Sequence, residues 1–222
     1  MEELKINEST NVVIVSQGND RWLYEICKRG FDFISSLAAI IIFAPVFFII
    51  GILIRLDSKG PVIFGHTRLG KDGEKIKVYK FRTMVINAEE VLKNMSVEMK
   101  KEFEKNFKFE NDPRITKVGK VLRETSLDEL PQLFNILIGN MTVVGPRPIV
   151  VKELDKYGIY GEKLLSVKPG LTGNWQANGR SDTTYEERVQ LDMDYIDTRS
   201  AWMDIKIIFK TVFVVFKKEG AR

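Results

Sequence analysis

Residues 123–148 read RETSLDELPQLFNILIGNMTVVGPRP, a stretch that combines an acidic pair with an arginine between two prolines. Apolar residues recur at helical spacing after the acidic pair Asp128-Glu129, which predicts a helix beginning at the pair. Ser126 and Glu129 have the spacing of a capping box. Asp128 would serve equally well as the N-cap, with Pro131 then in the first turn. On these letters alone, the two carboxylates either cap a helix or belong to a site.

A site is favoured because a capping box uses one carboxylate and this stretch supplies two. Adjacent helical residues do not share a face, so Asp128 and Glu129 would reach different partners in one pocket. A helix N-terminus favours negative charge and also binds phosphate. An ionised carboxylate can attack phosphorus, and a second one can hold Mg²⁺. We therefore predict that both residues are catalytic and lie at a metal site.

Arg147 lies between Pro146 and Pro148, which restrict the backbone around it. An isolated GPRP sequence is more often a rigid surface turn with a solvated arginine. Beside an acidic helix start, however, a fixed guanidinium is suited to grip phosphate oxygens with two parallel hydrogen bonds. Arg147 is predicted to bind substrate phosphate.

The composition narrows the chemistry. The 222 residues carry 34 Lys+Arg against 30 Asp+Glu, a net charge of +4, which suits an anionic membrane face or anionic substrates. No nucleic-acid motif is visible. One cysteine, Cys27, and one histidine, His66, exclude the usual zinc clusters, so any metal should have oxygen ligands. His66 is expected to be structural and Cys27 an inert thiol.

Residues 33–54 carry no charge and, as a helix, would span roughly 30 Å, enough to cross a bilayer. Basic residues flank this segment on both sides, Lys28-Arg29 before it and Arg55 and Lys59 after it, and both flanks therefore favour the cytoplasmic side. Pro45, near the middle, can kink the helix. These features suggest a broken helix that enters and leaves by one leaflet. A plain spanning helix fits the charges and the proline equally well.

Residues 61–70 and 74–84 are predicted to form a hairpin, because Lys71-Asp72-Gly73 is a strong turn signal between them. The motif KFRTM makes Lys80 and Arg82 candidates for phosphate binding, whereas Arg68 is expected to be solvated. Other expectations concern a tail or strand over 1–20, a helix and loop over 87–109, helices over 117–124, 150–165 and 184–197, a turn-rich break over 168–173, and a short strand over 174–177.

Two further arginines are candidate site residues. The helix over 117–124 carries Arg123 close to the acidic pair. Gly179 would allow a close backbone approach, and Arg180 after it is a second candidate phosphate clamp. Residues 202–218 place apolar side chains on one face and lysines on another, typical of a helix lying in the membrane interface. A core-facing helix of a soluble domain has the same pattern.

The chain resembles the monotopic phosphoglycosyl transferases, the bacterial sugar transferases that start exopolysaccharide, capsule, O-antigen or glycoprotein glycan synthesis. The resemblance covers roughly residues 28–218, close to the minimal catalytic unit. It rests on stretches that occur in the family's order: KRGFD with the apolar run, GPVIF, KVYKFRTM, DPRITKVGKVLRETSLDELPQLFNIL, VGPRP, KPGLTG, NGR and LDMDYI.

The resemblance implies a re-entrant membrane helix with both ends in the cytoplasm. It implies that Asp128 is the nucleophile and that Glu129 helps bind Mg²⁺, with Arg123, Arg147 and Arg180 around them. The reaction it implies moves a sugar-1-phosphate, a hexose by family habit, from a UDP-sugar to undecaprenyl phosphate and releases UMP. Two departures are visible: Ala44 where many relatives have serine before the proline, and Asn140 where many have aspartate.

The resulting expectation is an α+β protein at the cytoplasmic face of the bacterial inner membrane. Its parts are a tail over 1–27, a re-entrant helix over 28–59, a catalytic domain over 60–201 and an amphipathic interface helix over 202–222. The domain should contain a β-hairpin and several helices. Expected partners are the UDP-sugar, undecaprenyl phosphate and membrane lipid, with no nucleic acid. An exposed Leu/Phe surface would serve a homodimer as well as lipid.

Two rival functions remain from the sequence. A membrane-bound, Mg²⁺-dependent nucleotide-sugar hydrolase would use the same acids and arginines but need no lipid acceptor. A non-catalytic membrane partner of another glycan enzyme would tolerate replacement of Asp128 and Glu129.

Overall fold

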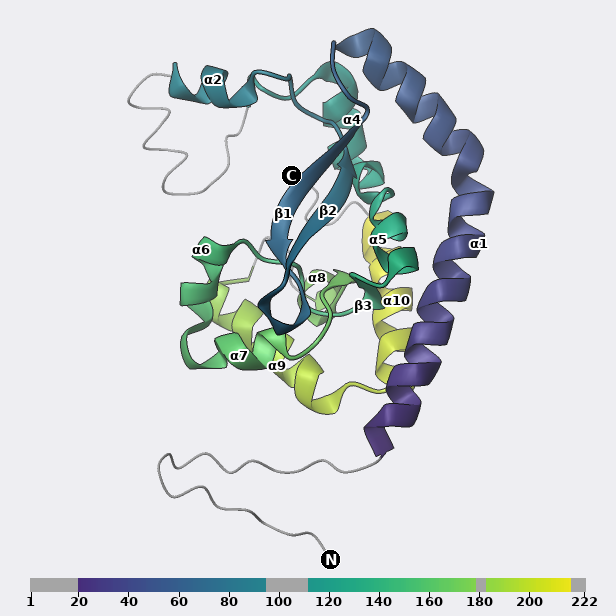
Figure 1. The fold of residues 1–222 in the computed structure, drawn as a ribbon, viewed down its shortest axis with the longest axis vertical. Coiled ribbons are helices and arrows are strands. Elements are labelled where there is room, and N and C mark those ends of the chain that lie inside the picture. The colour runs from purple at the N-terminus through teal and green to yellow at the C-terminus, as the bar shows by residue number, and fades with distance from the viewer. Residues whose placement is uncertain (1–19, 95–111, 179–182, 217–222) are drawn as a thin grey trace, which may run out of the picture.

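The computed structural model describes residues 20–94, 112–178 and 183–216 and shows a mixed α+β fold. One long helix, α1, runs along one side of the molecule, with α5 beside it and the hairpin β1–β2 on the far side of α5 (Figure 1). Residues 1–19, most of the helix and loop expected over 87–109, and Arg180 lie outside the described residues.

Helix α1 (Asp20–Asp57) is the one described helix long and apolar enough to cross a membrane. It begins before Lys28, the start expected for the membrane segment, and it continues through Pro45 without interruption. Figure 1 shows it bending over the top of the molecule in its second half. Proline removes one backbone donor and can bend a helix whose remaining bonds hold, so the helix is curved but not broken.

Both halves of α1 are attached to the same globular part of the chain. Near its start, Arg29 donates to the carbonyls of Ile136 and Leu137 at 2.7 and 2.8 Å. At its end, a carboxylate oxygen of Asp57 accepts from the backbone N–H of Val118 at 3.0 Å. The two ends of this helix are therefore held by one body.

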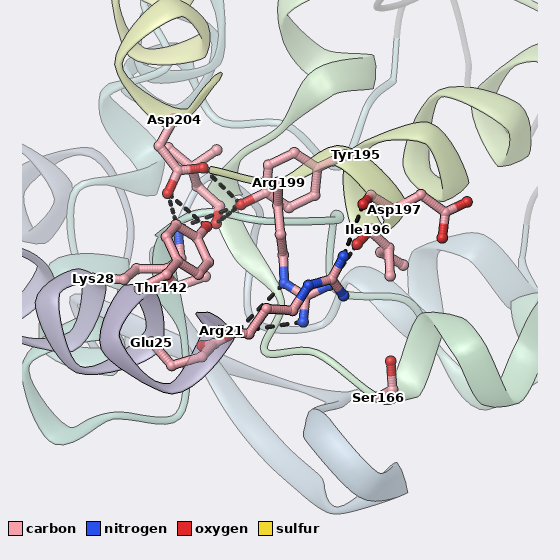
Figure 2. A network of polar contacts seen from close by, with 12 residues as sticks. Arg21, Glu25, Lys28, Thr142, Ser166, Tyr195, Ile196, Asp197, Arg199 and Asp204 are labelled. Atoms are coloured by element: carbon pink, nitrogen blue, oxygen red, sulfur yellow. Dashed lines mark hydrogen bonds and ion pairs between the residues drawn. The ribbon is translucent and has the colours of Figure 1, made fainter. Parts of the chain in front are cut away.

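A polar network fixes the first turns of α1 to the C-terminal helices α9 (Tyr185–Thr198) and α10 (Ala201–Phe216) (Figure 2). Lys28 Nζ lies 2.5 Å from Asp204 Oδ2, and both side chains are almost fully buried. The hydroxyl of Tyr195 donates to the other oxygen of Asp204 at 2.8 Å. Arg21 adds a bond to the carbonyl of Asp197.

The predicted hairpin is confirmed. Strands β1 (Ile63–Leu69) and β2 (Lys75–Phe81) pair antiparallel, and the turn Lys71–Gly73 joins them through Asp72 with φ 56° and Gly73 with φ 77°. Directly opposite residues share a face of the ladder. The register places Lys80 opposite Phe64.

Two described helices follow the hairpin along the chain. The short helix α2 (Ala88–Lys93) lies in the segment expected to be helical. Helix α4 (Lys117–Glu124) has the predicted bounds and begins at Thr116, whose hydroxyl oxygen accepts from the N–H of Gly119 at 3.0 Å. Its Leu122 is 3% exposed and packs into a cluster with Ile54 of α1. Helix α4 is thereby fixed between the long helix and the hairpin.

Two expectations in the second half of the chain were wrong. The turn-rich break contains strand β4 (Gly170–Thr172), which pairs in parallel with β3 (Thr142–Val144). A Cβ added at Gly170 would lie 2.1 Å from the backbone nitrogen of Gly145, so these glycines permit a close approach of two backbones. The strand expected next is a helix, α8 (Asn174–Asn178).

The helical region expected over 150–165 is divided into α6 (Val151–Leu154), a 3₁₀ helix (Asp155–Tyr160) and α7 (Gly161–Leu165). Gly158, with φ 50°, interrupts it. Helix α9 agrees with its prediction and begins at a full capping box between Thr184 and Glu187. Helix α10 buries Asp204 and Ile207 and exposes Phe209 and Phe213, so its apolar residues are divided between two faces.

Candidate active site

The acidic pair lies in a tight turn before α5 (Gln132–Ile138), not at the start of that helix. Leu127–Glu129 form a 3₁₀ helix, and Ser126 has a left-handed φ of 57° and caps nothing with its side chain. Pro131 occupies the N-cap position, so both predicted caps, the capping box and Asp128, were wrong. Pro131 has no N–H to donate back to Leu127, so it adds no α-helical hydrogen bond between the turn and α5. Neither carboxylate occupies the N-cap position of α5.

Lys80 forms ion pairs with both carboxylates. Its Nζ lies 2.6 Å from Glu129 Oε1 and 3.8 Å from Asp128 Oδ2. Asp128 is 9% exposed, and burial is the main reason why its pKa is raised. The charge of Lys80 opposes that shift, the charge of Glu129 adds to it, and Arg123 opposes it. One carboxyl is thus buried beside two cations, while the other faces the pocket.

The position of Lys80 is set by Asn135, which is fully buried on α5. Its side-chain nitrogen donates to the carbonyl of Lys77 at 2.7 Å, and its side-chain oxygen accepts from the N–H of Tyr79 at 2.9 Å. These two bonds hold strand β2 against α5. The helix that follows the acidic pair therefore also holds the strand that carries Lys80.

Arg123 is brought to the pair as predicted. Its Nε donates to the hydroxyl of Thr83 at 2.9 Å, which fixes the side chain on α4. Burial lowers the pKa of Arg123, and the nearby negative charge of Asp128 opposes this shift. The positive charge of Arg123 therefore contributes to the electrostatic field at Asp128.

Arg147 also lies at the site. It lines a pocket together with Lys80 and Glu129, and its guanidinium carbon lies 5.9 Å from the ring centre of Trp175. The same pocket is lined by His66 and Arg68 of the hairpin, by Gln132 of α5 and by Gln176 of α8. Strand β4 also contributes to its lining. The pocket therefore combines a carboxylate with several cationic side chains.

Arg82 does not join these residues. Its guanidinium donates to the carbonyl of Pro61 at 2.6 Å and to the carbonyl of Ser58 at 2.8 Å, where the chain leaves α1. Burial is the main cause of the lowered pKa of Arg82. The nearby charges that also affect this pKa are those of Arg55 and Asp57, and neither carboxylate of the acidic pair is among them. In this structure the guanidinium of Arg82 fastens the end of α1 and does not line the pocket. Arg180 lies outside the described residues.

Two residues of β1 that line the pocket, His66 and Arg68, were not predicted to belong to the site. The signal was present in the hairpin register. Residues two apart on a strand share a face, and Phe64 pairs with Lys80. Fixing the Lys71-Asp72-Gly73 turn therefore places both residues on the face of Lys80.

The KRGFD motif holds the elements that carry the site. Arg29 closes the C-terminal end of α5, as described above. Asp32, 3% exposed, accepts from the hydroxyl of Thr142 at 2.6 Å and from the N–H of Val143 at 2.9 Å. These bonds fasten α1 to β3, the strand that leads into Gly145 and Arg147. The motif thus fastens α1 to the elements that carry the site.

The donor chemistry of the acidic pair fits a hard divalent cation. Mg²⁺ is usually held by one or two carboxylates together with water and substrate phosphates. The described residues offer two adjacent carboxylates, and the charge of Glu129 raises the pKa of Asp128, a repulsion that a bound cation would relieve. No group of three or more metal-binding side chains is found among the described residues. Substrate and water would have to supply the remaining ligands.

Sequence comparison places these residues in a known family. Residues 23–218 match the family described as bacterial sugar transferase. The chain is 47% identical over 197 residues to the undecaprenyl-phosphate galactose phosphotransferase of Salmonella typhimurium, covering 87% of this chain and 41% of that protein. It is 44% identical over 204 residues to the UDP-glucose:undecaprenyl-phosphate glucose-1-phosphate transferase of Escherichia coli, covering 88% and 41%.

A shorter relative is matched over most of its length. The exopolysaccharide production protein ExoY of Rhizobium meliloti is 42% identical over 199 residues, covering 88% of each chain. Against the two longer relatives, the chain spans about two fifths of their length. The chain therefore belongs to the bacterial sugar transferase family.

Proposed function

We propose that this chain transfers a hexose-1-phosphate from a UDP-sugar to undecaprenyl phosphate, releasing UMP, at the cytoplasmic face of the bacterial inner membrane. The product would begin exopolysaccharide or related glycan synthesis. The observation that carries this proposal is the pair Asp128-Glu129 beside Lys80, in a pocket that also contains Arg147. The names of the relatives support the donor, the acceptor and the pathway.

The reaction proceeds in two displacements. A carboxylate oxygen of Asp128 attacks the β-phosphorus of the UDP-sugar, and the bond to the bridging oxygen breaks, so UMP leaves with that electron pair. An oxygen of undecaprenyl phosphate then attacks the same phosphorus. The bond to Asp128 breaks and its carboxylate is restored. A covalent intermediate lets two anionic substrates visit one small site in turn.

Each nearby side chain has a part in this scheme. Lys80 and Arg123 favour the ionised form of Asp128, which its burial disfavours. Arg147 grips phosphate oxygens, and Glu129, together with Asp128, holds Mg²⁺. When bound, the cation neutralises diphosphate charge and stabilises the leaving phosphate. Arg180 is retained as a second phosphate-binding residue on the resemblance alone.

The attachment of α1 supports a re-entrant course in the membrane. Lys28 and Arg29 contact the globular domain at one end of the apolar run, and Asp57 contacts it at the other. A helix that crossed a bilayer would separate these two ends by roughly 30 Å of hydrocarbon. Exposed apolar residues of α1 and α10 would then lie in the same leaflet, including Ile41, Phe48, Phe209 and Phe213.

The chemistry is tested with a donor radiolabelled in its sugar and β-phosphate. The native protein should become labelled without acceptor, and Asp128→Asn should lose both the label and turnover. Asp155→Asn, which removes an exposed carboxylate elsewhere, is the matched control and should behave as native. Retained turnover in Asp128→Asn, or an unlabelled native enzyme, would contradict the covalent scheme. Label that stays in water after acceptor is added would favour the hydrolase. Activity that survives loss of both acids would favour a non-catalytic role.

Topology is tested through the exposed Cys27 and a second probe, Lys59→Cys, made in a Cys27→Ser background. A membrane-impermeant maleimide should label both positions only from the cytoplasmic side. Labelling of the two positions from opposite sides would show a spanning helix.

A further inference from the structure

One wall of the pocket carries two side chains with no role in the scheme above, Arg68 and His66. The guanidinium of Arg68 is largely buried, with 18% of the side chain exposed. Its recorded polar neighbours are His66 Nδ1 at 3.2 Å and Glu153 Oε1 at 3.9 Å. A guanidinium has five N–H donors, so within the described residues most donors of Arg68 are unused.

The surroundings of Arg68 are rich in positive charge. Burial lowers its pKa, and the charges of Arg147 and Arg188 lower it further, while Glu153 opposes the shift. Glu153 is shared, because its other oxygen lies 4.0 Å from Arg188. Neither distance is short enough for a hydrogen bond. A largely buried cation without a close anionic partner is costly, and an anion arriving in the pocket would supply that partner.

His66 adds a neutral donor to the same wall. Burial and the charges of Arg68 and Lys80 lower its pKa, so the ring is neutral at pH 7. Because a guanidinium can only donate, Nδ1 of His66 accepts from Arg68 and the ring proton lies on Nε2. Arg147 contributes as well, since its contact with the face of Trp175 leaves its in-plane N–H groups to other acceptors. The wall therefore presents donors that suit phosphate oxygens.

The two displacements fix where such a phosphate must be. When Asp128 attacks in line, the UMP oxygen leaves from the opposite side of the phosphorus. The second displacement reverses this path, so the acceptor oxygen enters where the UMP oxygen left. The phosphate of UMP and the phosphate of the lipid acceptor must occupy the same position in turn.

We propose that Arg68 and His66, together with Arg147, form this single phosphate subsite, which holds the phosphate of UMP in the first step and that of the polyprenyl phosphate in the second. The inference rests on the proposed function and extends it by two residues and by the sharing of one position. Its ligand chemistry is a phosphomonoester, whether on a nucleoside or on a lipid.

The test uses the full chain in detergent micelles containing undecaprenyl phosphate, with UMP as the competing ligand. Arg68→Met should raise the KM for undecaprenyl phosphate and the inhibition constant of UMP by the same factor, about tenfold or more for a lost charge-assisted contact. Inhibition by uridine, which has no phosphate, should not change. Lys77→Met removes a cation from an exposed position of the neighbouring strand and should leave both constants as in the native protein.

His66→Ala, at an exposed strand position, tests the same two constants without removing a buried charge. It should raise both constants together by a smaller factor, and His66→Gln, which keeps an N–H donor, should restore them. A rise in only one constant, or in neither, would overturn the shared subsite. If the native enzyme is labelled by donor and both constants are unchanged in Arg68→Met, the inference fails alone. If the native enzyme is not labelled by the donor, that result would instead contradict the proposed function itself.

Discussion

Lys80 donates to Glu129 at 2.6 Å while its ammonium group lies 3.8 Å from Asp128, so one cation serves two neighbouring carboxylates. The arrangement has a consequence for pH dependence. Burial raises the pKa of Asp128 above the ordinary value of about 3.9, and Lys80 limits that rise. Only the ionised carboxylate can attack phosphorus.

Removing Lys80 should therefore shift the acid limb of the activity profile. As pH falls through the raised pKa of Asp128, kcat/KM should fall because the nucleophile becomes protonated. In Lys80→Met this limb should move to higher pH, since a charge that lowers the pKa is gone. Measuring kcat/KM from pH 5 to 9 for native, Lys80→Met and Lys80→Arg tests this, with Lys80→Arg expected near native. An unmoved limb in Lys80→Met would show that Lys80 does not control the ionisation of Asp128.

Asn135 should be essential to stability as well as to the site. Asn135→Ala leaves the carbonyl of Lys77 and the N–H of Tyr79 without their partner, which should lower the free energy of unfolding by about 3 kcal/mol. Activity should fall too, because β2 carries Lys80. Denaturant unfolding in detergent measures the first effect. Asn140→Ala, at an exposed position nearby, is the control and should change stability by less than about 0.5 kcal/mol.

Two ion pairs of nearly equal length should differ in strength because their burial differs. Lys28 and Asp204 lie 2.5 Å apart with side chains 11% and 12% exposed, so Lys28→Met should lower the free energy of unfolding by about 3 to 5 kcal/mol. Lys163 and Asp197 lie 2.6 Å apart but are 36% and 58% exposed. Lys163→Met should cost less than about 1 kcal/mol. Similar losses in the two variants would show that burial does not govern these pairs.

Two glycines in helices should respond to alanine with opposite signs. A Cβ at Gly119 would lie 2.2 Å from the carbonyl oxygen of Thr83, so Gly119→Ala must displace α4 and lose about 1 to 3 kcal/mol. At Gly30 nothing lies within 4 Å, so Gly30→Ala should gain up to about 1 kcal/mol from helix propensity. Thermal unfolding of both variants checks the signs. A stabilised Gly119→Ala would mean that α4 moves away from Thr83 without penalty.

Features governed by local physical chemistry could be predicted from the sequence. The Asp72-Gly73 turn fixed the hairpin, because only residues that tolerate positive φ can make it. Helix α4 was placed correctly because Thr116 caps it and apolar residues follow at helical spacing. Asp128, Glu129 and Arg147 were predicted from their chemistry and Lys80 from its motif, and the structure brings these four residues close together.

Features that depend on distant parts of the chain could not be predicted. The strand Gly170–Thr172 exists because its backbone meets Gly145, and no local pattern reveals that contact. Arg82 and Lys80 looked equivalent in KFRTM, but the chain leaving α1 provides carbonyls for Arg82 and the acidic pair faces Lys80. The turn at Ser126 was taken for a helix start, because left-handed φ at serine leaves no sequence signal.

The fastening of α1 to the C-terminal helices has a consequence for biosynthesis. Tyr195 and Asp204 follow Lys28 by 167 and 176 positions. At about 5 to 20 residues per second, the ribosome completes Asp204 on the order of 10 s or more after Lys28. During that interval the ammonium of Lys28 lacks the carboxylate of Asp204, so α1 cannot yet be fastened to α10. Nascent chains that stop before α10 should thus be less stable and more open to proteolysis than chains that include it.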